Sequence, residues 1–528
     1  MTELDSMANE ADGVARRRLK STAVFAGWTA VSRVAGLARE ILAAALFGTT
    51  GLVNAFTLAF QVPNLLRSLV ADSALSAAFI PVFTELEENK RADEARRLAM
   101  SLAALFSLVL GLVTLVAILV APWVMPAIGG FEGEAEDELV LYTQIMLPIV
   151  PLLALTGLVM ALLQIGGKFG VTAFAPVLWN VLIIAVLGVS ALMLDGDDRL
   201  IGYAVGIVVG TLGQLLFLIP FLRGLGPFPR PRELWNEHVQ KVIVLMLPVV
   251  LGLGLINVNL VVGSAIASEV NPNEGVQPLN LAFRLYLLPQ GIFSVAVATV
   301  LFPDIGRLAA RKANDALRRT VTSGLRQIFL VLVPASVGMI LLAEPIVRLV
   351  FEYGEFDAGS TDITSGALVF YSLGLAFNGA SLLLIRTFFG LQRPWLPTAV
   401  AGLGAALFVP LAIGLAELME IDGIALATSI VSLVTFVILF ALLRRELGGI
   451  DTRLLTQGFL LSLVMGVIAG ALALGVWSAL DELLGRELIA QIVSMSGALL
   501  VGAAAFALLA FMTIPEVRGL VRERLSLR

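Results

Sequence analysis

The segment LAALFSLVLGLVTLVAILVA, residues 102–121, runs for twenty residues without a charged side chain. A helix of about 20 residues is about 30 Å long, which matches the hydrocarbon core of a bilayer. Lipid offers the backbone no hydrogen-bond partners, so an apolar segment that crosses it is expected to be helical. This segment therefore predicts a membrane-spanning helix, and comparable segments recur along the whole chain.

The composition agrees with lipid as the main solvent of the chain. Of its 528 residues, 58% are hydrophobic and only 14% are charged. A soluble protein of this size is expected to carry more polar surface. The chain contains no cysteine, a single histidine at His238, and no G-x-x-x-x-G-K-[ST] pattern of an ATP-binding loop. We therefore expect no disulfide, no thiolate or two-histidine metal site, and no cofactor.

About fourteen segments are long and apolar enough to cross a bilayer, which predicts an all-α polytopic membrane protein. They lie near 24–48, 53–84, 97–127, 138–165, 171–194, 200–222, 240–268, 277–306, 320–343, 363–391, 396–417, 422–444, 455–480 and 488–513.

The loops between these segments alternate in charge. Lysine and arginine gather in one set of loops, at 16–20, 90–97, 168, 223–241, 307–319, 393, 444–453 and 518–528. The other set is nearly free of both and includes FEGEAEDE at 131–138, DGDD at 195–198, SEVNPNEG at 268–275 and ELMEID at 417–422. Because basic loops stay in the cytoplasm, we expect both termini to be cytoplasmic.

An internal repeat relates two parts of the chain. FIPVF at 79–83 matches LFPDI at 301–305, and ADEARR at 92–97 matches NDALRR at 314–319. Both matches share an offset of 222 positions. Six predicted spans separate the copies, so both have the same orientation, as in secondary transporters with parallel halves.

The repeat predicts the domain organisation. We expect two six-helix lobes around a central cavity and two further helices outside the repeat. The predicted boundaries are a polar N-terminus at 1–21, an N-lobe at 22–225, a C-lobe at 226–447, helices 13 and 14 at 448–513, and a basic tail at 514–528.

Several ionisable residues fall inside predicted spans, where each costs at least ~2.5–3.5 kcal/mol at the bilayer centre. They are Arg33, Arg39, Glu40, Arg67, Asp72 and Arg284. One explanation is that long arginine side chains reach the headgroups. A second is internal pairing of an arginine with Glu40 or Asp72. A third is a cavity lined by guanidinium groups, which bind phosphate bidentately and stay charged when buried.

Two motifs carry a resemblance to a known family. SRVAGLARE at 32–40 and NAFTLAFQVPNLLRSLVADSALSAAFIPVF at 54–83 resemble the opening of the bacterial lipid II flippase family (MurJ/MviN). That family lies within the multidrug/oligosaccharidyl-lipid/polysaccharide exporter superfamily. The resemblance continues through LPQGIFSVAVATVLFP at 288–303 and LVFEYGEFD at 349–357, and covers essentially the whole chain.

The resemblance implies a transporter in the bacterial cytoplasmic membrane, not an enzyme. Its substrate would be lipid II, an undecaprenyl diphosphate that carries the peptidoglycan building block, moved from the inner to the outer leaflet by alternating access. Arg33, Arg39, Arg67 and Arg284 align with the essential cavity arginines of the family. Glu40, Asn54 and Asp72 are candidate cavity or gate residues. The last two helices would form a groove for the lipid tail. We expect a monomer whose partners are lipids and not nucleic acid.

The chain departs from the family pattern at several positions. The family commonly has aspartate where Asn54 stands, and often aspartate where Phe283 stands. Some relatives bind sodium through an acidic residue in the seventh helix, which aligns with Gly263, and polar residues in the eleventh, which is almost wholly apolar here. Thr428 is the one matching ligand, so we do not expect sodium coupling.

Three other functions remain open at this point. The chain could be a flippase for another polyprenyl-diphosphate-linked glycan, of the capsule or teichoic-acid type. A drug or cation antiporter of the same superfamily fits less well, because the cavity arginines repel cations. A membrane glycosyltransferase would need a general acid or base, for which Glu352, Glu355 and Asp357 in an acidic external loop are the candidates.

Overall fold

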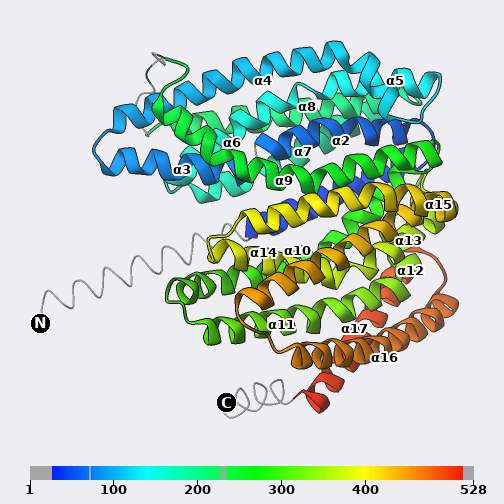
Figure 1. Cartoon of the computed structure of the whole chain (residues 1–528). Coiled ribbons are helices and arrows are strands. Elements are labelled where there is room, and N and C mark those ends of the chain that lie inside the picture. Colours follow the sequence, from blue (N-terminus) through cyan, green and yellow to red (C-terminus); the bar gives the residue numbers. More distant parts are fainter. Residues whose placement is uncertain (1–26, 71–72, 225, 227–228, 230–232, 515–528) are drawn as a thin grey trace, which may run out of the picture. The chain divides into compact units, whose positions relative to one another are not determined.

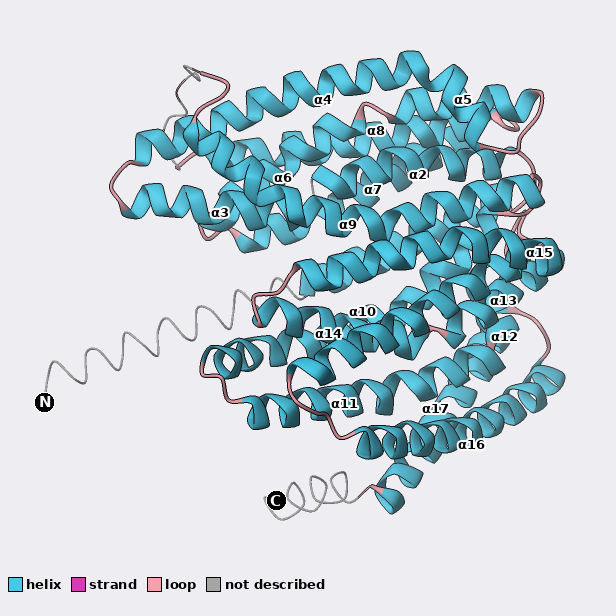
Figure 2. Cartoon of the chain, viewed as in Figure 1, coloured by secondary structure: helices cyan, strands magenta, loops and turns pink. Residues whose placement is uncertain are grey.

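The structure is a computed structural model that describes residues 27–70, 73–224, 226, 229 and 233–514. Its described part consists of helices joined by loops and contains no strand (Figure 2). Two compact units make up the chain: unit 1 comprises Met1–Phe47 and Gly51–Val261, and unit 2 comprises Gly48–Thr50 and Val262–Arg528. The boundary between the units lies inside a helix at residue 261, whereas the repeat placed the lobe boundary at 225, so the lobes stay a prediction.

Unit 1 begins with a helix over 27–47 (Figure 1). It continues with α2 (Leu52–Val70), α3 (Ser73–Glu88), α4 (Ala92–Ile128), α5 (Glu134–Met146), α6 (Ile149–Ile165), α7 (Phe169–Met193), α8 (Asp198–Leu218), the 3-10 turn η1 (Ile219–Leu222) and most of α9 (Glu237–Val270). Within this unit α7 packs along α8, α2 along α5, and α4 along α5 and α6.

Unit 2 contains the end of α9 and the remaining helices. They are α10 (Val276–Ala310), α11 (Asn314–Leu341), α12 (Ala343–Phe351), α13 (Ala358–Leu373), α14 (Leu375–Gly390), α15 (Trp395–Glu446), α16 (Thr452–Leu484) and α17 (Leu488–Thr513). The last two helices pack against each other, and α16 also packs along α11 (Figure 1).

The long helix α15 is a hairpin of two helices. Glu420 interrupts it with a φ of 51° and a ψ of −131°, which no helical residue adopts. A Cβ on Gly423 would clash with the carbonyl of Leu415, eight positions earlier, although eight residues of straight helix span about 12 Å. A Cβ on Gly404 would lie 3.3 Å from the Thr435 hydroxyl, so the two arms run antiparallel. The sequence predicted this turn from the acidic loop at 417–422.

The long helices expose apolar side chains, as membrane-spanning helices do. Within the described residues, nine helices are long and apolar enough to cross a membrane, or ten if the pair α13 and α14, bent by 46°, is one span. Large apolar side chains stand exposed along α4, including Leu108, Leu112, Leu115 and Leu119. Such a stripe is unfavourable in water and favourable in hydrocarbon. The chain is therefore a multi-pass membrane protein, as its composition predicted.

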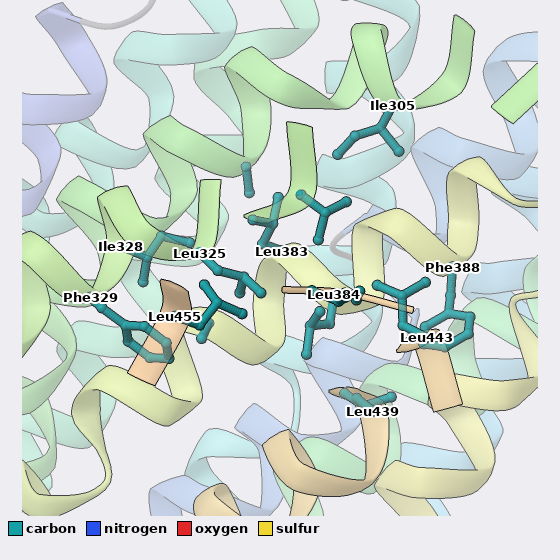
Figure 3. Packing of buried hydrophobic residues seen from close by; sticks show 14 of the residues in the cluster. Ile305, Leu325, Ile328, Phe329, Leu383, Leu384, Phe388, Leu439, Leu443 and Leu455 are labelled. Carbon is teal, nitrogen blue, oxygen red and sulfur yellow. The ribbon is translucent and has the colours of Figure 1, made fainter. Parts of the chain in front are cut away.

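The core of unit 2 joins five of its helices (Figure 3). Ile305 from α10 and Leu325 from α11 pack with Leu383 from α14, Leu443 from α15 and Leu455 from α16. All five side chains are nearly inaccessible. This packing fixes α10, which carries one of the candidate arginines, against the rest of unit 2.

Candidate functional site

Arg39 and Glu40 form a buried ion pair on the helix over 27–47. Arg39 Nη2 lies 2.5 Å from Glu40 Oε1, and the two residues are only 4% and 5% exposed. The guanidinium carbon of Arg39 also lies 4.8 Å from the centroid of the Trp179 ring on α7, a cation–π contact. Both residues therefore sit inside unit 1, which agrees with the internal pairing that the sequence left open.

The pairing leaves part of the Arg39 guanidinium unused. Its Nε and Nη1 atoms are buried and find no hydrogen-bond partner among the described residues. A buried donor without a partner costs about 1–3 kcal/mol, and more when it is charged. Arg39 can therefore still donate to a water or to an anionic ligand that reaches it.

Arg33 lies on the same helix but in a different environment. It is exposed, whereas Arg39 is buried. Six residues separate the two, which is about 9 Å along the axis and about 120° around it on a straight helix. Among the described residues of this helix, Arg33 is thus the arginine whose side chain is not enclosed by other residues.

The candidates from the second predicted span are only partly described. Asn54 is fully buried in the first turn of α2, where its Nδ2 donates to the Gly51 carbonyl at 3.3 Å. Arg67 lies on α2, but its side chain is outside the described part of the chain. Asp72 lies outside the described residues altogether.

Arg284 is half-buried on α10 in unit 2, and the residue that precedes it belongs to a cluster of aromatic rings. The neighbouring Phe283 ring lies 5.4 Å from the Tyr371 ring and 5.6 Å from the Tyr286 ring. The Tyr286 hydroxyl accepts a 2.7 Å hydrogen bond from Asn378, which in turn accepts one from Gln290 at 3.2 Å. Phe283 therefore belongs to an aromatic cluster, at the position where the family resemblance implied an aspartate.

The position aligned with the sodium ligand has apolar surroundings. A Cβ on Gly263 would lie 3.4 Å from the Phe408 ring and 3.5 Å from Ile424. The hydroxyl of Thr428 donates to the Ile424 carbonyl at 3.2 Å. No group of three histidine or acidic side chains suited to a metal occurs in the residues that the structure covers. The atoms nearest to a Cβ at Gly263 are therefore apolar carbons.

A second buried arginine was missed by sequence reasoning. Arg348 on α12 is 5% exposed, and its Nη2 lies 2.5 Å from Glu344 Oε1. Its Nη1 lies 3.3 Å from Asp481 Oδ2 on α16, and its guanidinium carbon lies 5.3 Å from the centroid of the Trp477 ring. The four-residue spacing of Glu344 and Arg348 was the available signal, but nothing local points to Asp481.

Two of the three acidic loop residues considered as catalytic candidates, Asp357 and Glu352, have structural partners. Asp357 caps α13 by accepting a 2.8 Å hydrogen bond from the backbone N–H of Ser360. These backbone hydrogen bonds hold the pKa of Asp357 below its usual range. Glu352 accepts a 2.6 Å hydrogen bond from the Thr361 hydroxyl. A carboxylate with a lowered pKa is a poor general acid or base. The Asp357 side chain therefore serves as the N-cap of α13.

Sequence comparisons relate the chain to one protein family. The family profile described as "Lipid II flippase MurJ" matches residues 43–497. A "Probable lipid II flippase MurJ" of Rhizobium meliloti (strain 1021) is 33% identical over 476 residues, 87% of each chain. The "Lipid II flippase MurJ" of Burkholderia cenocepacia is 31% identical over 386 residues, 71% of this chain and 74% of that protein.

Solved structures show the same fold. One described as "Lipid II flippase MurJ, inward closed conformation" matches with a TM-score of 0.78 at 22% identity, covering 94% of this chain and 100% of that one. An inward-facing multidrug-resistance transporter of the MATE family matches with a TM-score of 0.70 at 16% identity, covering 79% of this chain and 94% of that one. The chain therefore belongs to the lipid II flippase MurJ family, a family of transporters rather than enzymes.

Proposed function

We propose that this chain moves lipid II, the undecaprenyl-diphosphate-linked peptidoglycan precursor, from the inner to the outer leaflet of the bacterial cytoplasmic membrane. The observation that carries the proposal is the match of the lipid II flippase profile to residues 43–497. The arginines on membrane helices in both units add the chemistry, because guanidinium groups recognise diphosphate bidentately and keep their charge in lipid.

In this proposal the arginines have different tasks. Arg33 is exposed and Arg284 is half-buried, so both are assigned direct contact with the diphosphate. Arg67 is assigned the same task from its place in the sequence motif. Arg39 shares its charge with Glu40 and is assigned to fixing the helix that presents Arg33, with its two unused donors available to substrate. Alternating access of the two units would then release the substrate outside.

The proposal includes fourteen spans with both termini in the cytoplasm. Three observations support adding spans to the nine found by length and hydropathy. The hairpin of α15 provides two spans instead of one, and the bent pair α13 and α14 provides one more. The helix over 27–47, the pair α2 and α3, and α9 supply the remaining three.

Because the chain has no cysteine, its orientation can be tested with single cysteines. Lys90→Cys and Asp197→Cys place one thiol in a basic loop and one in an acidic loop. We expect a membrane-impermeant maleimide to label Cys at 197 but not at 90 in intact cells. The opposite pattern would reject the proposed orientation.

Transport itself is tested by reconstitution. Purified protein in vesicles is given fluorescent lipid II in one leaflet, and its appearance in the other leaflet is followed with a membrane-impermeant quencher. We expect Arg33→Ala and Arg284→Ala to lower the rate at least tenfold. Arg393→Ala is the matched control, because Arg393 lies in a loop and pairs with Glu446 at 2.9 Å. No lipid II movement by the unaltered chain, or equal rates for all variants, would reject the proposal.

A flippase for a different polyprenyl-diphosphate-linked glycan is the second candidate. Asn54 and Phe283, which stand where the family commonly has aspartate, favour it because they alter the polar surroundings of the arginines. The same assay with an undecaprenyl-diphosphate glycan that lacks the peptide separates the two. Faster movement of that lipid than of lipid II would favour the second candidate.

The apolar surroundings of Gly263 support a further part of the proposal, that sodium is not coupled to transport at this position. Lipid II movement should then be equal in sodium and potassium buffers of the same ionic strength.

A further inference from the structure

A cationic pocket lies at one end of unit 2, outside the helix segments that carry the candidate cavity arginines. It has a volume of about 600 Å³ and lies between the beginning of α11 and the turn that joins α15 to α16. The α11 wall contributes Arg318, Arg319 and Arg326, and the turn contributes the segment 449–451 with Leu454 from α16. The proposed transport mechanism makes no use of this pocket.

The pocket residues of α11 form one face of the helix. Arg319, Thr322, Ser323 and Arg326 occupy positions i, i+3, i+4 and i+7, which line up along one side of a helix. Arg319 and Ser323 are exposed, and Arg326 is half-buried. Two guanidinium groups about 10 Å apart along the axis, with a hydroxyl between them, therefore face the same space.

The two acidic residues at the pocket are already engaged. Asp315 pairs with Arg318, with Oδ1 and Nη2 2.6 Å apart. Asp451 caps α16 by accepting a 3.0 Å hydrogen bond from the backbone N–H of Leu454. Among the described residues that line the pocket, three arginines stand against two aspartates, and both carboxylates are held by partners on their own helices. This balance favours an anion in the pocket.

Unit 1 provides an internal comparison for this face. At the same offset of 222 positions, Asp93 pairs with Arg96 at 2.7 Å, as Asp315 pairs with Arg318 at 2.6 Å. The repeat counterpart of Ser323 is Ser101, whose hydroxyl donates to the Glu233 carbonyl at 2.9 Å. In unit 1 the backbone of Glu233, which precedes α9, thus occupies the space beside this serine.

The counterpart of Arg326 in unit 1 is Ala104, so the second arginine is also particular to unit 2. The open space and the additional positive charge therefore occur together in unit 2. Neither the open space nor the additional arginine is needed to start helix α11.

We propose that this pocket binds a phosphate group, and that an anionic phospholipid headgroup is its main source. The arginines supply bidentate donors for phosphate oxygens, and Ser323 supplies a hydroxyl. Basic pockets between membrane helices at the cytoplasmic surface suit anionic headgroups. The sequence places the 307–319 and 444–453 loops among the basic set, so both walls of the pocket belong to that side. The site is an accessory lipid site and is independent of the lipid II proposal.

The absence of cysteine in the chain allows a direct binding test. Leu454→Cys carries a bimane label at the pocket rim and leaves the arginines intact. The full chain is reconstituted in phosphatidylcholine vesicles that contain either brominated phosphatidylglycerol or brominated phosphatidylcholine at equal mole fraction. We expect at least twofold more quenching of bimane by the brominated phosphatidylglycerol. A second arm adds inorganic phosphate to vesicles of phosphatidylcholine alone, and a shift of bimane emission there identifies a soluble source.

Matched variants separate the pocket from general surface charge. Arg319→Gln, alone and with Arg326→Gln, should abolish the excess quenching. Arg97→Gln removes the repeat counterpart of Arg319 in unit 1 and should leave it unchanged. The single variant guards against loss of folding, because Arg319 is exposed. Absence of both the excess quenching and the phosphate response would overturn the proposal, and so would excess quenching that survives in the Arg319→Gln and double variants. The assay measures lipid binding, so its result tests the pocket independently of lipid II transport.

Discussion

Arg348 on α12 and Asp481 on α16 form an ion pair between helices that are distant in sequence, with Nη1 and Oδ2 3.3 Å apart. The side chains are 6% and 14% exposed. Because the guanidinium also lies over the Trp477 ring, one arginine joins the short helix α12 to α16. The pair therefore helps to hold α16 in unit 2.

Breaking this pair should destabilise the protein strongly. Removing one partner of a buried ion pair leaves an uncompensated charge and costs about 3–5 kcal/mol. We expect Arg348→Ala to lower the thermal unfolding midpoint in detergent by several degrees, and Asp481→Ala, which leaves Arg348 paired with Glu344, to lower it by less. Arg393→Ala breaks the more exposed pair with Glu446 and should cost less than about 1 kcal/mol. Equal midpoints for all three variants would contradict the assignment.

Substitutions of the two arginines on the helix over 27–47 should have different effects, one mainly on stability and the other mainly on transport. Arg39→Ala removes the guanidinium partner of a carboxylate that is 5% exposed, so we expect a loss of thermal stability of about 3 kcal/mol. Arg33 is exposed, so Arg33→Ala should leave stability within about 0.5 kcal/mol while lowering lipid II movement. Arg39→Ala combined with Glu40→Ala should recover much of the lost stability. If Arg33→Ala unfolds the protein instead, the division of tasks is wrong.

Local patterns account for what the sequence predicted. The turn of the α15 hairpin coincides with ELMEID at 417–422, because charged residues between two apolar runs stay out of lipid. The repeat predicted equivalent starts for α4 and α11, and both begin with the same aspartate–arginine pair three residues apart. Each of these signals lies within a few residues of the feature that it predicts.

Contacts between distant segments account for what the sequence could not predict. Arg39 meets Trp179 only because α7 packs beside the helix over 27–47, as the approach of Gly36 to Asn180 also shows. Arg348 meets Asp481 across 133 positions. The free-energy cost of a charge in the bilayer singles out the arginines from the sequence. Only the packing of distant helices decides whether a protein carboxylate or a substrate phosphate compensates each charge.

The cap of α13 should make stability depend on pH at the acidic end. Its backbone hydrogen bonds lower the pKa of Asp357 in the folded protein from its usual 3.8. The carboxylate thus contributes stability that is complete above about pH 4 and is lost as the pH falls through the lower folded-state pKa. We expect Asp357→Ala to cost about 1 kcal/mol at pH 7 and to reduce the loss of stability on acidification. Asp357→Asn keeps the cap acceptor and should stay near the unaltered protein at pH 7. A larger loss at pH 7 for asparagine than for alanine would contradict the cap.

Replacing either of two glutamates in the turn region of α15 by glycine should change stability in opposite directions. Glu420 has a positive φ of 51°, a conformation that costs a residue with a side chain about 1–3 kcal/mol and costs glycine little. Glu420→Gly should therefore raise the thermal unfolding midpoint. Glu417 is exposed within the first arm, so Glu417→Gly should lower stability by about 1 kcal/mol because glycine is a poor helix former.

Gly423 completes the test of the hairpin. Its added Cβ would meet the backbone of Leu415, which cannot move aside as a side chain can, so we expect Gly423→Ala to destabilise the protein more than Glu417→Gly does. If α15 were instead one continuous helix, Glu420→Gly would lower the midpoint as Glu417→Gly does, and Gly423→Ala would raise it. The signs of these three shifts therefore decide between a single long helix and the two antiparallel spans that the fourteen-helix topology requires.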